Sequence, residues 1–138
     1  MASNLKVGII GGAGYTGGEL IRLLINHPET EIAFIHSKSN AGNPVAKVHQ
    51  DLLGETDLKF TGDNYFNEML LGNSSSGVKH EKTVLFLCLG HGDSKKFLTE
   101  NAISDKIKII DLANDFRLAK DAAFGSKQFV YGLPELQK

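Results

Sequence analysis

The sequence has 138 residues, of which 41% are hydrophobic and 22% charged, and its charged residues have a formal net charge of −1 and form no basic stripe. The length and composition are typical of one globular domain, and the charge distribution argues against a nucleic-acid-binding surface. No apolar run approaches the roughly 20 residues of a membrane-spanning helix. A single cysteine, Cys88, excludes an intrachain disulfide and is typical of a reducing cytoplasm, where we expect the protein to act without nucleic-acid or membrane partners.

The first predicted elements are a strand, a helix and a second strand. Residues 5–10 form a short apolar run that ends in glycines, as expected of a buried parallel strand. From Tyr15 to Leu24 the apolar residues take a helical spacing, and Pro28 closes this helix. Residues 31–36 are again apolar and predict a strand, so the three elements form a βαβ unit.

The middle of the chain predicts mostly loop. Residues 37–55 are polar and contain glycine and proline, which indicates a long loop with one helical turn. Apolar pairs at i,i+4 predict a short helix over residues 63–71, and the serine-rich stretch 72–77 predicts a flexible loop.

The second half of the chain alternates strand and helix again. Residues 83–89 are apolar almost throughout and predict a central parallel strand. A helix over residues 93–103 and a strand over residues 107–112 follow, whereas residues 113–138 have little periodicity. Alternating strands and helices predict an α/β fold with a parallel sheet.

A glycine-rich segment lies between the first predicted strand and the first helix, and it fits both G-x-x-G-x-x-G and G-x-G-x-x-G. Glycines there allow a tight turn and close approach of the backbone to a pyrophosphate, and the helix N-terminus offers free N–H groups. The position inside a βαβ unit favours a Rossmann-type doubly wound sheet that binds a dinucleotide over a glycine-rich turn without a ligand. The predicted cofactor-binding residues of the turn are Gly11, Gly12, Ala13, Gly14, Tyr15, Thr16 and Gly17.

The end of the second predicted strand indicates which dinucleotide is bound. An NAD site usually has an Asp or Glu there, about 20 residues beyond the glycines, to accept from the ribose hydroxyls. This sequence has Ser37, Lys38 and Ser39 instead, which offer two hydroxyl donors and a cation to the 2′-phosphate of NADP. The alternative is an exposed polar loop; we favour NADP.

Segments that run in order along nearly the whole chain resemble N-acetyl-γ-glutamyl-phosphate reductases. The matching segments include residues 14–20, 37–42, 48–49, 86–92, 111–118 and 130–135. Gly-Tyr-Thr-Gly-Gly and Asp-Phe-Arg-Leu are specific to this group, whereas other dinucleotide-binding folds share only the glycines. The resemblance implies an enzyme of arginine biosynthesis that uses NADPH to reduce N-acetyl-γ-glutamyl phosphate to the semialdehyde.

The resemblance also implies covalent catalysis, in which a cysteine attacks the acyl phosphate and the thioester takes a hydride. In the family this cysteine and a histidine base follow the Tyr-Gly-Leu-Pro-Glu segment, here residues 131–135. We therefore expect residues 1–138 to be an N-terminal dinucleotide-binding domain that is inactive alone. The full-length enzyme is expected to be a homo-oligomer.

Cys88 and the histidines could take part in chemistry, but each of them also has a plainer structural interpretation. Cys88 lies inside an apolar run and is interpreted as a packing residue, because a reactive thiol needs exposure and an electropositive setting. His91 follows the predicted central strand, where it either lines the cofactor crevice or is a loop histidine without a ligand. The remaining histidines have no metal-like spacing, so no metal is expected.

Three residues near the end of the chain are candidate substrate-binding residues. Arg117 suits bidentate binding of a phosphate or carboxylate, and the alternative is an ion pair with Asp111 or Asp115. Tyr131 and Glu135 border the substrate by resemblance, whereas their spacing alone indicates only a turn with an exposed acid. Two rival functions stay open: an aspartate-semialdehyde dehydrogenase-type reductase, and a non-catalytic NADP sensor.

Overall fold

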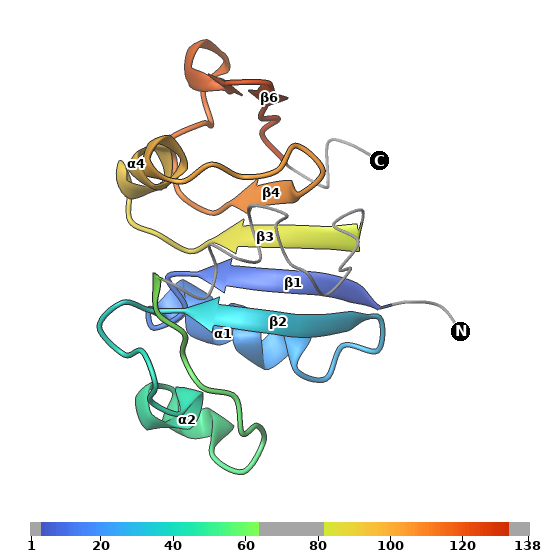
Figure 1. Ribbon diagram of the computed structural model, residues 1–138, viewed down its shortest axis with the longest axis vertical. Coiled ribbons are helices and arrows are strands. Elements are labelled where there is room, and N and C mark those ends of the chain that lie inside the picture. Colours follow the sequence, from blue (N-terminus) through green and yellow to red (C-terminus); the bar gives the residue numbers. More distant parts are fainter. Residues whose placement is uncertain (1–3, 64–81, 133–138) are drawn as a thin grey trace.

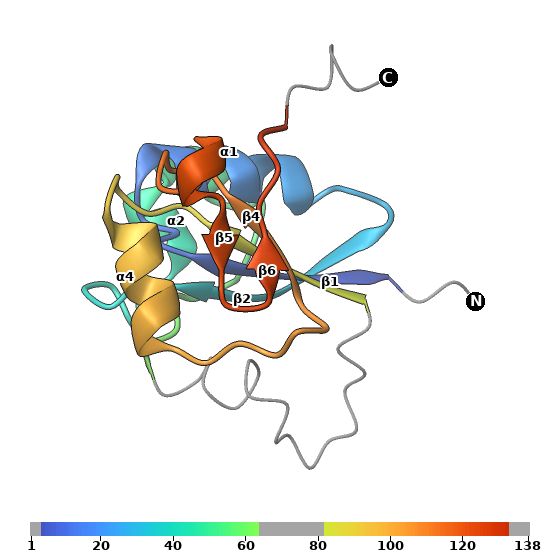
Figure 2. The same cartoon turned by 90° about the horizontal axis from the view of Figure 1, so that it is seen from above.

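The computed structural model describes residues 4–63 and 82–132. Its centre is a four-stranded sheet with the order β2-β1-β3-β4, in which every pair of neighbours is parallel. The strands are β1 (Leu5–Ile10), β2 (Thr30–His36), β3 (Thr83–Leu87) and β4 (Lys108–Asp111). Helix α1 (Tyr15–Leu24) connects β1 to β2, and α4 (Asp93–Glu100) connects β3 to β4. Figures 1 and 2 show the two helices on opposite faces of the sheet, which confirms the doubly wound α/β fold.

Alternating side chains of β1 supply the core on both faces of the sheet. Val7 and Ile9 pack with Ile21 of α1, whereas Ile10 packs with Leu98 of α4. Gly8 faces the α4 side, where an added Cβ would lie 2.5 Å from the Phe34 ring. A strand that is buried on both faces reads as a continuous apolar run, which is why β1 could be predicted so closely.

The segment predicted as a long loop contributes to the core. It forms α2 (Val45–Val48) and the 3-10 helix η1 (Gln50–Leu52), then continues as an extended segment beside β2. Val45, Leu52 and Phe60 are buried against α1 and β2. The sequence therefore underestimated how much of this segment is helical and buried. Its buried apolar residues are too widely spaced along the chain to form a local pattern.

Element ends and the tail also differ from the prediction. Strand β3 ends at Leu87, two residues early, and α4 ends at Glu100, where the Asn101 backbone turns extended and its side chain donates to the Phe97 carbonyl. The tail forms the 3-10 helix η3 (Ala119–Asp121) and a hairpin of β5 (Ala123–Phe124) and β6 (Lys127–Gln128).

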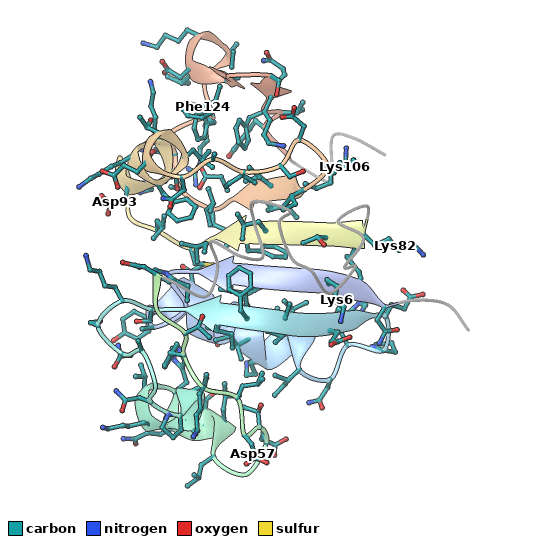
Figure 3. All side chains as sticks on the ribbon, viewed as in Figure 1. Lys6, Asp57, Lys82, Asp93, Lys106 and Phe124 are labelled. Atoms are coloured by element: carbon teal, nitrogen blue, oxygen red, sulfur yellow. The ribbon has the colours of Figure 1, made fainter. Side chains whose placement is uncertain are left out.

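Aromatic packing holds this tail to the sheet. Phe116 stacks on Phe129, with ring centroids 4.2 Å apart, and meets the edge of Phe124 at 5.9 Å. Figure 3 shows Phe124 between the tail and α4. The helix predicted over residues 63–71 and the serine-rich loop 72–77 lie, apart from Asp63, outside the described residues. Within the described ranges, no helix has the length and apolar character needed to cross a bilayer.

Candidate functional site: the carboxyl ends of the strands

The sheet reverses its winding direction between β1 and β3, because α1 and α4 leave these strands on opposite faces. In open α/β sheets the crevice at such a switch point, beyond the carboxyl ends of the strands, is where ligands bind. A cavity of about 390 Å³ lies there. It is lined by Gly11, Ala13, Gly14, His36, Ser37, Lys38, Ser39 and Leu89. The glycine turn and the Ser37–Ser39 segment, which the sequence predicted as parts of one site, therefore meet around one cavity.

Close packing explains the glycines of the turn. A Cβ on Gly12 would lie 2.2 Å from Ile35 Cγ2, and a Cβ on Gly17 would lie 2.7 Å from Gly12 Cα. Gly11 has a φ of +78°, and a Cβ there would approach the Cys88 carbonyl oxygen to 2.6 Å. At Gly14, by contrast, a Cβ would meet no atom within 4 Å, so this residue borders open space.

Hydrogen bonds within the turn decide which amides can serve a ligand. The amides of Gly11 and Gly12 both donate to the His36 carbonyl, at 3.1 and 2.9 Å. Gly14 is the N-cap of α1 and has no side chain to cap it, and the first turn of the helix has no acidic residue. The first N–H groups of a helix have no partner inside it. An anion at this end would therefore meet amides from Ala13 onward and the positive end of the helix dipole.

The Ser37–Ser39 segment presents hydroxyl groups whose orientation is set by Asn40. Asn40 Nδ2 donates to Ser37 Oγ at 3.3 Å and to Ser39 Oγ at 3.2 Å. Because each hydroxyl accepts this bond, its own proton stays available to donate elsewhere. Lys38 is exposed and takes part in none of the ion pairs among the described residues. Asn40 was missed as a site residue because its role depends on side-chain direction.

Asp63 brings a carboxylate to the end of β2 from outside the local sequence. Thr61 forms a parallel bridge with His36, and Asp63 Oδ1 lies 2.7 Å from His36 Nε2. Asp63 does not line the cavity, whereas His36 does. The sequence has no carboxylate next to Ser37, but the fold brings the Asp63 carboxylate to the end of β2, where His36 binds it.

Hydrogen bonds connect the loops that follow β3 and β4. The Asp115 carboxylate accepts from the amides of Gly92 and Lys95, at 2.7 and 2.8 Å, and so caps α4. Ser94 Oγ donates to Asp111 Oδ1 at 2.6 Å. The Asn114 amide donates to His91 Nδ1 at 3.1 Å, so the neutral His91 ring carries its proton on Nε2. His91 is exposed and does not line the cavity at the glycine turn.

Arg117 and Tyr131 lie together, but in a different cavity. This cavity, of about 800 Å³, runs along β4 and the tail, and shares no lining residue with the one at the glycine turn. The Arg117 guanidinium lies 5.9 Å from the Tyr131 ring centroid, and Nη2 donates to the Leu112 carbonyl at 3.4 Å. Asp111 and Asp115 are engaged by Ser94 and α4 instead, and among the described residues neither pairs with Arg117. The ion-pair alternative for Arg117 was therefore wrong; Glu135 lies outside the described residues.

Cys88 comes directly after β3 and is half-buried among residues that pack on the α1 side of the sheet. Burial, with a smaller contribution from the negative charge of Asp111, raises the pKa of the Cys88 thiol to about 11. A thiol with so high a pKa is almost entirely protonated at neutral pH and is a poor nucleophile. These features support the interpretation of Cys88 as a packing residue. In the described part of the chain, no three His, Cys, Asp or Glu side chains group as metal ligands would.

The parallel sheet, the glycine turn before α1 and the cavity at the switch point together define a Rossmann-type dinucleotide-binding domain. A family model described as the NAD-binding domain of semialdehyde dehydrogenase matches residues 6–138, and the chain belongs to this family. The predicted fold and the type of cofactor, a nicotinamide dinucleotide, agree with it.

Curated relatives agree with the resemblance found in the sequence. The chain is 49% identical over 134 residues to the N-acetyl-gamma-glutamyl-phosphate reductase of Flavobacterium johnsoniae. It is 50% identical over the same length to that of Bacteroides thetaiotaomicron and 52% identical to that of Azobacteroides pseudotrichonymphae. Each alignment covers 97% of this chain but only 36–37% of the relative, so the chain spans little more than a third of their length.

Proposed function

We propose that this chain is the NADP-binding domain of an oxidoreductase that reduces N-acetyl-γ-glutamyl phosphate to its semialdehyde with NADPH. The observation that carries the proposal is the cavity at the switch point, around which the glycine turn and the Ser37–Ser39 segment meet. The relatives described above suggest the substrate, because they are named as N-acetyl-gamma-glutamyl-phosphate reductases. The reaction belongs to arginine biosynthesis in the cytoplasm.

The cavity suits a dinucleotide in two ways. The free amides at the start of α1 suit its diphosphate, since they combine hydrogen-bond donors with the positive end of a helix dipole. Open space at Gly14, where a Cβ would meet no atom within 4 Å, lets the diphosphate approach the backbone closely. When bound, the nicotinamide supplies the hydride of the reaction. The residues of this chain bind and orient the cofactor, and His91 extends the site beyond β3 with its Nε2–H group.

The end of β2 favours NADP over NAD. A 2′-phosphate carries close to two negative charges and accepts several hydrogen bonds. Ser37 and Ser39 have protons to donate, since their oxygen atoms already accept from Asn40, and Lys38 adds a cation that forms no ion pair among the described residues. Asp63, the one described carboxylate that contacts β2 near this point, is bound to His36 and stands outside the cavity.

The acyl-phosphate chemistry is assigned to a cysteine outside residues 1–138, because the thiol of Cys88 is half-buried and has a raised pKa. Arg117, Tyr131 and Glu135 are proposed to serve the substrate. Arg117 supports this role with an exposed guanidinium that no carboxylate neutralises among the described residues. The whole enzyme is proposed to be a homo-oligomer.

Calorimetric titration of the 138-residue chain with NADP⁺, NADPH, NAD⁺ and NADH tests this function. The phosphorylated cofactors are expected to bind more tightly than their NAD counterparts. Equal affinities would contradict the role of the Ser37–Ser39 segment, and no binding by any of the four would contradict the function itself. Adding the acyl phosphate and NADPH together should give no NADPH oxidation; a measurable rate would restore Cys88 as a nucleophile.

A further inference from the structure

His49 contacts the glycine turn from a segment far along the chain. It lies between α2 and η1, and its Nε2 atom is 2.7 Å from the carbonyl oxygen of Gly12, 37 positions earlier. A carbonyl oxygen only accepts, so the proton is on Nε2 and the imidazole donates this hydrogen bond. At 2.7 Å the bond is at the short end of the usual range for an N–H donor and an oxygen.

Packing holds the imidazole ring in this position. The ring rests on α1 at Gly18, where a Cβ would lie 2.6 Å from His49 Nδ1. On the segment that follows, the buried Phe60 ring lies 6.2 Å away, centroid to centroid. Only glycine at position 18 leaves room for the ring, so the sequence of α1 and the position of His49 depend on each other.

With His49 in place, both backbone groups of Gly12 have partners. Its amide donates to the His36 carbonyl at 2.9 Å, and its carbonyl accepts from His49. The peptide between Gly12 and Ala13 cannot rotate without breaking the bond to His49. Ala13 and Gly14, which follow, line the cavity, whereas His49 lines a separate hollow together with Tyr15, Gly18 and Glu19.

We propose that His49 is a positioning residue for the diphosphate-binding turn. Its hydrogen bond directs the Gly12 carbonyl away from the cofactor, where an oxygen atom would repel phosphate, and holds the next amides in their binding orientation. A site ordered before binding loses less entropy when its ligand arrives, which strengthens binding. This inference rests on the proposed nucleotide-binding function and assigns His49 to one part of the site, the diphosphate part.

Two probes separate this role from general support of the fold. NADPH is expected to contact both the glycine turn and the Ser37–Ser39 segment. Adenosine 2′-phosphate has no diphosphate, so it is expected to contact only the Ser37–Ser39 segment. His49→Phe keeps an aromatic ring against Gly18 and Phe60 but removes the donor. A neutral hydrogen bond contributes a factor of about three to ten, so NADPH should bind about three- to tenfold more weakly and adenosine 2′-phosphate less than about twofold more weakly. His27→Phe, at an exposed histidine whose ring accepts from the Glu29 amide, is the matched control and should change neither affinity.

A second variant covers the case in which His49→Phe does not fold. Gly18→Ala adds a Cβ that displaces the His49 ring but leaves the imidazole itself in the chain, and its gain in helix propensity in α1 offsets part of the cost of the clash, so the variant should fold and should weaken NADPH selectively. Equal weakening of both probes, or no weakening of NADPH in either variant, would overturn the inference while leaving the proposed function intact. Failure of the unmodified chain to bind NADPH would instead overturn both.

Discussion

Charge reversal at Lys38 is the sharpest test of the preference for NADP. Lys38 is exposed, lines the cavity at the end of β2 and is free of ion pairs among the described residues. Two unit charges 4 Å apart in water attract by about 1 kcal/mol, which is a factor of about five in affinity. Lys38→Glu changes the side-chain charge by two units, so even for one negative charge on the 2′-phosphate the NADP⁺ affinity should fall by about 25-fold at low salt, and further for a doubly charged phosphate.

NAD⁺ provides the internal control, because it lacks the 2′-phosphate and its affinity should change by less than about threefold. The ratio of the two dissociation constants, measured by calorimetry at low ionic strength, should therefore move toward NAD⁺ and move less when salt is added. Lys96→Glu, at an exposed position on α4, makes the same change in net charge and should leave the ratio unaltered. An unchanged ratio in Lys38→Glu, or the same shift in Lys96→Glu, would refute the role of Lys38.

Three further changes test other parts of the site. Asn40→Ala removes the donor to both serine hydroxyls, so NADP⁺ should bind about threefold more weakly while NAD⁺ is unaffected; a parallel loss for both cofactors in calorimetry would count against Asn40 as an orienting residue. Gly12→Ala forces a Cβ against Ile35 and should lower the free energy of unfolding in urea by about 1–3 kcal/mol, whereas Gly14→Ala should leave it nearly unchanged and weaken NADP⁺ instead. With its pKa raised by burial to about 11, Cys88 should have about a hundredfold less thiolate at pH 8 than an exposed cysteine. Its alkylation should be correspondingly slow and should still accelerate about tenfold between pH 9 and pH 10, whereas a rate that levels off by about pH 10 would show an ordinary thiol.

The sequence was most informative where function and local pattern coincide. Strand β1, the glycine turn, α1 and β2 follow one another with short connections, and each has its own periodicity or composition, so the bounds of the two strands and the start of α1 were predicted to within one residue. The glycine turn and Ser37–Ser39 lie close together because they follow β1 and β2. These strands are parallel neighbours, so their carboxyl ends lie at the same edge of the sheet.

Contacts between distant segments could not be predicted in the same way. His49 is 37 positions from the carbonyl it binds, and Asp63 reaches His36 only because residues near Thr61 extend beside β2. No periodicity encodes such pairs, since their positions depend on how residues 37–63 fold back beside β2 and α1. The position of Arg117 could not be predicted for the same reason. Its expected partner Asp115 caps α4, which is distant in sequence, and does not pair with the guanidinium.

A crystal structure of this chain with NADP⁺ tests the central claim most directly. We expect the diphosphate at the start of α1, within about 3 Å of the amides from Ala13 onward, and the 2′-phosphate at hydrogen-bonding distance from Ser37, Lys38 or Ser39. A cofactor bound elsewhere, with the glycine turn left empty, would contradict the account.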